Sequence, residues 1–168
     1  MVILYFILSL FIYNQETRYV IENSTIHFYS YAPLEDIQGI NSQALGALVK
    51  ETGEYLIKIP MSSFEFPNKL MQKHFNDSYL ETDKYPECIF KGTLDGDTAK
   101  GEITLHGVTK KIQIPASINE DGDRITIQSE FKILLQEFKI KIPRLLFKNI
   151  AEEIEVKVSS SFTKYKRE

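Results

Sequence analysis

The sequence has little cysteine and no tryptophan, since Cys88 is the only cysteine in 168 residues. A single cysteine cannot form a disulfide within the chain, so the fold must be held together by an apolar core. The chain is long enough for one domain to bury such a core. Cys88 lies within an alternating apolar pattern, which predicts a small buried residue rather than a reactive thiol.

An excess of basic charge is also missing. Twenty Lys and Arg residues stand against 23 Asp and Glu residues, which gives a net charge of −3. Binding to a phosphate backbone needs clustered basic residues, so we predict no nucleic-acid partner. The sequence contains no nucleotide-binding or hydrolase motif, and His27, His74 and His106 lack the spacing of a metal site. We therefore predict no catalytic residue, no metal and no cofactor.

Long apolar runs are limited to one, at residues 2–13. This run is shorter than the 18 or more residues that a spanning helix needs, so we predict no membrane span. Its length suits the apolar part of a signal peptide, and we predict a signal peptide over residues 1–16 with the domain at 17–168. No Lys or Arg precedes the run, which leaves open whether the segment is complete. The alternative is that the run forms the first strand of the domain.

Most of the chain after residue 16 alternates apolar and polar side chains, which is typical of strands with one buried face. We predict such strands at residues 25–29, 55–59, 88–94, 103–105, 112–118, 125–129 and 154–160. Turn residues separate them at 95–97, 106–107 and 119–123. Many short strands with tight turns indicate an all-β antiparallel sandwich or barrel, and the periodicity does not distinguish the two.

Residues 64–86 break the alternation. Leu70, Met71, His74 and Phe75 recur at helical spacing, which predicts a short helix over 68–75. The apolar side chains of this segment would cover one end of the sheet structure. A plug for the open end and a movable lid over a ligand need the same apolar face, so both interpretations stay open.

Three segments carry a resemblance to a known family. They are FEFPNKLMQKHF at 64–75, DKYP at 83–86 before Ile89-Phe90, and ITLHGVTK at 103–110. In this order and spacing, over roughly residues 17–162, the sequence resembles the YceI-like family of lipid- or polyisoprenoid-binding proteins. The resemblance implies a single extended lipocalin-like antiparallel β-barrel of about eight strands with one short helix capping an end. It also implies a periplasmic or secreted bacterial protein whose partner is an isoprenoid or fatty-chain lipid.

A barrel of this size is either filled by its own side chains or holds one small ligand. The small inward positions Gly92, Ala116, Ser129 and Ser160 would leave room for a ligand. Larger apolar side chains would form the walls of the cavity. We predict that the ligand-binding residues are Phe28, Ile57, Phe64, Phe66, Leu70, Met71, Phe75, Phe90, Ile103, Leu105, Ile114, Ile127 and Phe131.

These features predict non-enzymatic binding, transport or sequestration of an apolar chain, either a polyisoprenoid or a fatty acid or amide. An isomerase or cyclase built on a small barrel is the enzyme alternative, and it would need an acid or base in the cavity. Glu130, Glu137 and Tyr79 are the candidates for that role. A structural domain with a solid core is the third hypothesis. The sequence leaves open whether the protein forms a homodimer.

Overall fold

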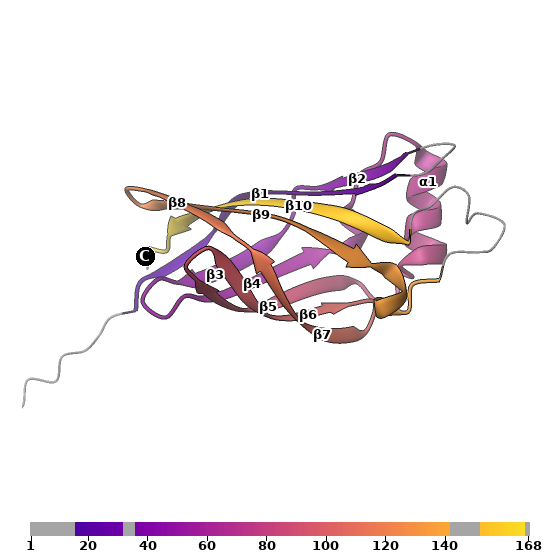
Figure 1. Cartoon of the computed structure of the whole chain (residues 1–168). Coiled ribbons are helices and arrows are strands. Elements are labelled where there is room, and N and C mark those ends of the chain that lie inside the picture. Colours follow the sequence, from indigo (N-terminus) through magenta and orange to yellow (C-terminus); the bar gives the residue numbers. More distant parts are fainter. Residues whose placement is uncertain (1–15, 32–35, 142–151, 167–168) are drawn as a thin grey trace, which may run out of the picture.

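Ten antiparallel strands contain most of the residues that the computed structural model describes, which are 16–31, 36–141 and 152–166. The strands curl into a barrel around an apolar interior (Figure 1). They are β1 (Arg18–Ser30), β2 (Ile37–Asn41), β3 (Leu45–Val49), β4 (Glu54–Pro60), β5 (Glu87–Asp95), β6 (Thr98–Leu105), β7 (Val108–Pro115), β8 (Ser117–Asp121), β9 (Arg124–Leu134) and β10 (Glu153–Lys164).

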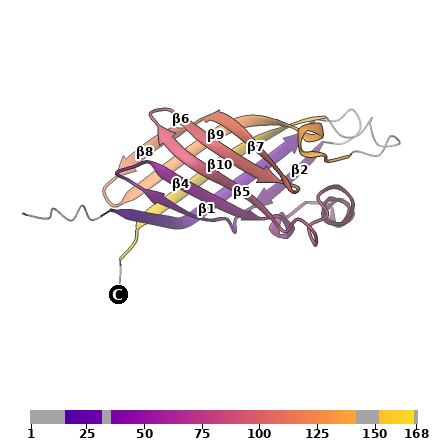
Figure 2. The ribbon, with the colours of Figure 1, turned by 90° about the horizontal axis from the view of Figure 1, so that it is seen from below.

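The sheet runs in the order β7-β6-β5-β4-β3-β1-β10-β9-β8, and β2 pairs with β1 beside this path. Hairpins join most neighbours, while the long pairing of β1 with β10 brings the two ends of the described chain together. Figure 2 shows the strands crossing the molecule at a slant, as barrel closure requires. The prediction of an antiparallel β-barrel is therefore confirmed.

Turn residues act where the sequence predicts them. His106 (φ 51°) and Gly107 (φ 72°) both adopt positive φ in the β6–β7 hairpin, the combination that a tight two-residue hairpin turn needs. A Cβ on Gly107 would lie 2.6 Å from the Tyr85 ring, so this glycine also permits a close approach. In the β8–β9 turn Gly122 (φ 58°) alone adopts positive φ, and a Cβ there would meet no other atom within 4 Å.

The single strand predicted over 112–118 is wrong, because the chain bends at Ala116 between β7 and β8. The N–H of Ala116 donates to the Asp97 carbonyl oxygen at 2.8 Å, which anchors the bend. Beyond it the side chains no longer follow the inward face of β7. Ile118, predicted to point inward, is 37% exposed on a strand whose residues are all exposed. The short strands β2 and β3 were not predicted from the alternation.

The barrel wall has a seam between β7 and β9. β8 pairs with the first half of β9, with Ser117 opposite Gln128 as the last pair of that ladder. After this point the Ser129 hydroxyl donates to the Pro115 carbonyl oxygen at 2.6 Å. Among the described residues no backbone ladder joins β7 to the rest of β9. Figure 1 shows the two strands parting toward the end that carries α1.

Short helical elements cover one end of the barrel (Figures 1 and 2). They are the 3-10 turns η1 (Met61–Ser63) and η3 (Leu135–Phe138), the helix α1 (Lys69–His74) and the π-helical turn η2 (Phe75–Tyr79). Asn68 begins α1, because its side-chain oxygen accepts from the N–H groups of Leu70 and Met71. The helix predicted over 68–75 is therefore confirmed and continues into η2. None of the helices in the described part of the chain has the length and apolarity to cross a bilayer.

Candidate ligand-binding cavity

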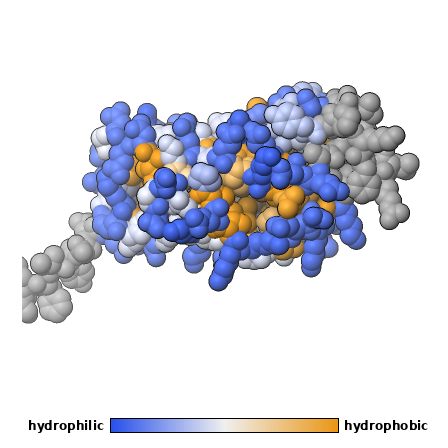
Figure 3. All heavy atoms as spheres, in the orientation of Figure 1, coloured by the Kyte–Doolittle hydropathy of each residue, from blue (hydrophilic) through white to orange (hydrophobic). Residues whose placement is uncertain are grey.

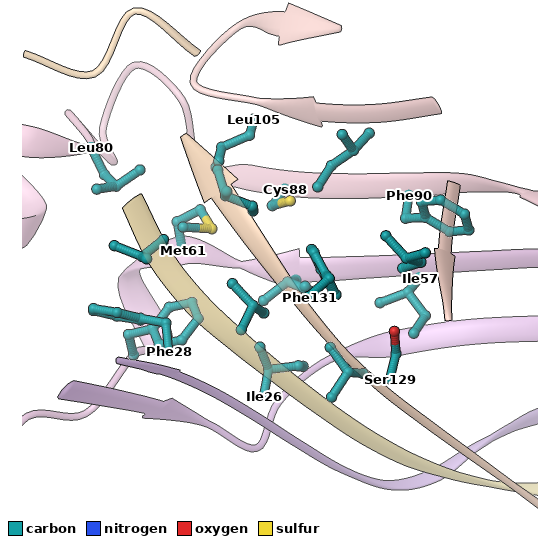
Figure 4. A pocket seen from close by; sticks show the side chains of 18 of the residues that line it. Ile26, Phe28, Ile57, Met61, Leu80, Cys88, Phe90, Leu105, Ser129 and Phe131 are labelled. Carbon is teal, nitrogen blue, oxygen red and sulfur yellow. The ribbon is translucent and has the colours of Figure 1, made fainter. Parts of the chain in front are cut away.

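An apolar cavity occupies the half of the barrel next to α1. Its volume is about 160 Å³, counted as the space open to the centre of a water molecule. Inward side chains of β1, β4, β5, β6 and β9 surround it, because alternate residues of every strand face the same side of the sheet. Figure 4 shows Ile26, Ile57, Phe90 and Phe131 directed into this common space, and Cys88 also lines it.

Twelve of the thirteen residues predicted to bind the ligand lie around the cavity. Leu70 does not, and its side chain is 61% exposed. The reason is the direction of α1, which turns Met71 toward the barrel and its neighbour Leu70 toward solvent. Contact between the twelve and a ligand stays a prediction. They are Phe28, Ile57, Phe64, Phe66, Met71, Phe75, Phe90, Ile103, Leu105, Ile114, Ile127 and Phe131.

Four phenylalanines close the α1 end of the cavity. Phe28 of β1 lies 5.4–5.7 Å, centroid to centroid, from the rings of Phe64, Phe66 and Phe75. Phe66 and Phe75 are 4.9 Å apart, and all four rings are buried. Such contacts add to the energy of burial. The segment that precedes α1 is thus part of the core at this end of the barrel.

The other end of the barrel is filled by protein atoms. The Tyr55 ring lies 5.7 Å from Phe90 and 5.8 Å from Phe162, centroid to centroid. Phe162 has no exposed surface, and Tyr19 and Leu48 are buried beside these strands. The cavity therefore ends at Tyr55 and does not run the full length of the barrel.

Very few polar groups face the cavity. Among its lining residues, Ser30, Ser129, Tyr55, Tyr79 and Cys88 carry a hydroxyl or thiol, and none carries a charge at neutral pH. Burial raises the pKa of the Cys88 thiol to about 12 and also raises the pKa values of Tyr55 and Tyr79. These groups stay protonated near pH 7, so the cavity favours apolar contacts over charge recognition.

His106 ties three loops together at the α1 end. Its Nδ1 lies 3.0 Å from the Phe138 carbonyl oxygen and its Nε2 lies 3.1 Å from Glu81 Oε2. The Tyr85 ring packs against the imidazole at 4.3 Å between centroids. Among the described non-glycine residues, positive φ occurs only at His106, Glu81 and Lys139, the last of which follows Phe138. Strained residues persist where their surroundings hold them, so this cluster fixes the loops that carry Leu80, Leu105 and Leu135.

Sequence patterns missed the cavity residues that lie outside regular strands, including Met61, Leu80, Leu135 and Ile140. Their signal was weak, because each lies in a turn or loop outside the alternating strands. Of the four small positions predicted to leave room, Ala116 and Ser129 line the cavity and Gly92 and Ser160 do not. A Cβ on Gly92 would lie 2.1 Å from the Lys100 carbonyl oxygen, so that glycine permits close packing of β5 on β6.

The acid and base candidates of the enzyme hypothesis are not together. Tyr79 lines the cavity, whereas Glu130 and Glu137 line a separate outer cleft. Glu130 pairs with Lys157 at 3.3 Å, and Glu137 pairs with Lys110 at 3.5 Å. No group of three metal-ligating side chains occurs in the part of the chain that the structure describes.

The fold and the cavity together define a lipocalin-like antiparallel β-barrel. The family model of the YceI-like domain matches residues 19–162, so the chain belongs to the YceI-like family. The protein named YceI from Shigella flexneri is 33% identical over 97 residues, which cover 51% of each chain. A UPF0312 protein from Pseudomonas savastanoi is 34% identical over 84 residues, which cover 42% of this chain and 44% of its own. The chain matches about half the length of these curated relatives.

Solved structures share the fold at low sequence identity. A polyisoprenoid binding domain from Saccharophagus degradans superimposes with a TM-score of 0.76 at 15% identity, covering 90% of this chain and 100% of that domain. BcnA of Burkholderia cenocepacia gives a TM-score of 0.70 at 16% identity, with 82% of this chain and 95% of that chain covered. These likenesses show the fold alone.

Proposed function

We propose that the protein binds a single apolar chain, of a polyisoprenoid or a fatty compound, in the barrel cavity without changing it chemically. One observation carries the proposal: a cavity whose lining is almost wholly apolar. Such a lining, with a few hydroxyl and thiol groups and no charged side chain among the described residues, does not suit a charged or sugar-like ligand. The polyisoprenoid binding domain from Saccharophagus degradans, which has the same fold, supports the same ligand class.

The energetics favour a chain over a ring system. Each methylene transferred from water contributes about 0.8 kcal/mol, so ten of them give a gross gain of about 8 kcal/mol before ordering costs are subtracted. A volume of about 160 Å³ lies beside side chains as far apart in the barrel as Tyr55 and Leu80. A thin flexible chain can follow this space, whereas a bulky head group cannot. A micromolar dissociation constant corresponds to about 8 kcal/mol net, so we expect binding that is micromolar or somewhat weaker.

The described cavity lining contains no carboxyl, imidazole or amino side chain, which is why we favour binding over catalysis. An isomerase or cyclase needs an acid or base poised near neutral pH beside the reacting atoms. Burial instead raises the pKa of the Cys88 thiol to about 12, and Glu130 and Glu137 lie on the outer cleft. We therefore propose a carrier or sequestering role for the domain.

The cellular setting belongs to the same proposal. Residues 1–16 are proposed as a signal peptide and 17–168 as the lipid-binding domain, with the mature protein in the periplasm or outside the cell. Residues 1–15 lie outside the described residues. Mass analysis of protein made in a bacterial host would test this directly. Loss of roughly the first 13 to 20 residues is expected, and an intact N-terminus would contradict export.

Extraction of the natively purified protein with organic solvent, followed by mass spectrometry, tests the binding proposal. A co-purifying isoprenoid or fatty compound is expected in about one copy per chain or less. Fluorescence titration with cis-parinaric acid methyl ester, a thin apolar chain, provides the second measurement. No lipid in the extract together with no uptake of this probe would overturn the proposal.

A further inference from the structure

The barrel wall is breached where β7 and β9 part. Extending the register of β8 with β9 would pair Gln113 with Lys132. Within the described structure, however, the last hydrogen bond between β7 and β9 in this direction is the one that the Ser129 hydroxyl donates to the Pro115 carbonyl oxygen. Beyond it a cleft with a volume of about 700 Å³ lies between the strands. Gln113 and Lys132 both line this cleft.

The cleft and the cavity share a wall. The residues common to both are apolar side chains of β6, β7 and β9, namely Ile103, Ile112, Ile114, Phe131 and Ile133. In Figure 3, seen from the same side as Figure 1, apolar residues are exposed in the middle of this face with polar residues on either side. Only side chains, and no paired backbone, therefore separate the cavity from solvent along this line.

The other routes into the cavity are closed by the described residues. At the α1 end, the buried rings of Phe28, Phe64 and Phe75 pack together, and His106 holds the adjacent loops. At the far end, Tyr55 packs on Phe162, which has no exposed surface. The remaining walls are antiparallel ladders except between β2 and β4, where the Asn41 side-chain amide donates to the Pro60 carbonyl oxygen at 2.7 Å and Ile40 forms an isolated bridge with Glu65. Entry at the cleft requires only a few side chains to move, so this route disturbs less structure than entry at either end of the barrel.

The mouth of the cleft is polar, but the described residues that line it offer no free cation. Its lining includes Glu130, Glu137, Glu153 and Glu155, with Lys132 as the single lysine. Lys132 lies 2.7 Å from Glu153. The neighbouring lysines are also paired, since Lys110 lies 3.5 Å from Glu137, and Lys157 lies 3.3 Å from Glu130 and 3.0 Å from Glu155. An anionic head group would find one carboxylate in excess here, whereas an uncharged polar group would meet hydrogen-bonding side chains.

We infer that the apolar chain enters the barrel sideways through this cleft and that its uncharged polar head group stays there. The inference rests on the proposed function and adds to it a route and a head-group class. The apolar side chains common to cleft and cavity would part to admit the chain. The head group would then lie among the ion pairs at the mouth, where water remains available.

A cross-link across the seam tests the route. In a Cys88→Ala background, Gln113→Cys and Lys132→Cys are joined with a short bismaleimide, and uptake of parinaric acid methyl ester is followed by stopped-flow fluorescence. Asn119→Cys and Thr126→Cys provide the matched control, because these residues already face each other in the β8–β9 ladder. The seam cross-link should slow uptake roughly tenfold or more, and the control should not. Protein loaded before cross-linking should release the probe more slowly by a similar factor.

The outcomes separate the inference from the proposed function. Unchanged uptake and release rates in the seam cross-linked protein, with normal equilibrium binding, would overturn entry through the cleft while binding itself stands. A failure of the unlinked cysteine variant and of the wild type to bind the probe would instead overturn the proposed function. Expulsion of preloaded probe by the cross-link would overturn the placement of the head group.

A second comparison tests the head-group class. Parinaric acid above pH 7 carries a charged carboxylate, whereas its methyl ester has an uncharged head group that is larger by one methyl group. We expect the ester to bind roughly fivefold more tightly, the scale of an exposed charge interaction. Replacing two cleft carboxylates, in the variant Glu137→Gln/Glu155→Gln, should reduce that ratio. Equal or tighter binding of the carboxylate to the wild type would overturn the assignment.

Discussion

Ser24 and Ser160 face each other across β1 and β10, and neither hydroxyl has a hydrogen-bond partner within the described structure. Ser160 has no exposed surface and Ser24 is 7% exposed. A buried hydroxyl without a partner costs about 1–3 kcal/mol relative to an apolar group of the same shape. This pair is therefore a weak point in the wall of the barrel.

Removing one of these hydroxyls should stabilise the fold. Ser160→Ala is expected to raise the free energy of unfolding by about 1 kcal/mol, because it deletes a desolvated polar group and leaves little empty space. Urea denaturation followed by circular dichroism measures the change. The neighbouring Ser159→Ala, on the more exposed face of β10, should change stability by less than about 0.5 kcal/mol. Equal effects of the two variants would show that the Ser160 hydroxyl is satisfied in solution.

The His106 cluster should matter more than any surface histidine. His106→Ala removes both contacts and leaves the Phe138 carbonyl oxygen buried without a partner. We expect a loss of about 3 kcal/mol in the free energy of unfolding. His27→Ala is the control, since His27 contacts Gln38 on the exposed side of the sheet, and it should cost less than about 0.5 kcal/mol. Thermal and urea unfolding measure both variants. A similar loss of stability in the two would contradict the structural role assigned to His106.

Cys88 should make stability fall at alkaline pH. Burial raises the pKa of its thiol from 9.0 to about 12, so the folded state keeps the proton that the unfolded chain releases. The contribution is complete below pH 9.0 and is lost as the pH rises toward 12, by roughly 1 kcal/mol per pH unit. The variant Cys88→Ala lacks the pH-dependent contribution of the thiol to stability, while the buried tyrosines still contribute as they do in the wild type. Urea denaturation across this range should show the wild type losing stability faster, and parallel slopes would contradict the burial of the thiol.

A paired substitution at the bend between β7 and β8 tests the cavity. Ala116 faces the cavity and Ile118, two positions along, faces solvent. Ala116→Phe should occupy part of the cavity and weaken binding of parinaric acid methyl ester roughly tenfold, while Ile118→Phe should not. Far-UV circular dichroism checks the fold of both. The variant Ser129→Leu adds a smaller apolar side chain to the same cavity. Normal binding by both Ala116→Phe and Ser129→Leu would show that the ligand binds elsewhere.

Ile118 and Gly92 show what alternation can and cannot predict. The period of two identified the inward faces of β1, β4, β5 and β9, because burial of one face imposes that period on a straight strand. It failed at Ile118, since a bend held by the Asp97 carbonyl oxygen lies outside the pattern. It also assigned Gly92 to the cavity, although this glycine serves contact between backbones.

The site depended on long-range packing that sequence spacing does not contain. Leu70 and Met71 are adjacent apolar residues in one short helix, and only the docking of α1 determines which of them faces the barrel. Met61 and Leu135 contribute from the 3-10 turns η1 and η3, to which the period of a strand does not extend. The seam between β7 and β9 depends on register, which hydrophobic pattern alone does not fix for an edge strand.

Leu70 and Met71 give the most direct test of how α1 closes the cavity. Met71→Glu would place a charge against an almost wholly apolar lining, so it should weaken binding of parinaric acid methyl ester roughly tenfold and lower stability by about 2 kcal/mol. Leu70→Glu lies on the exposed side of the same helix, at 61% exposure, and should change neither by much. Fluorescence titration and urea denaturation measure both effects. The variant Met71→Leu should bind the probe as the wild type does, because leucine provides a similar apolar volume. The opposite order, with Leu70→Glu the more damaging change, would mean that α1 docks on its other face in solution.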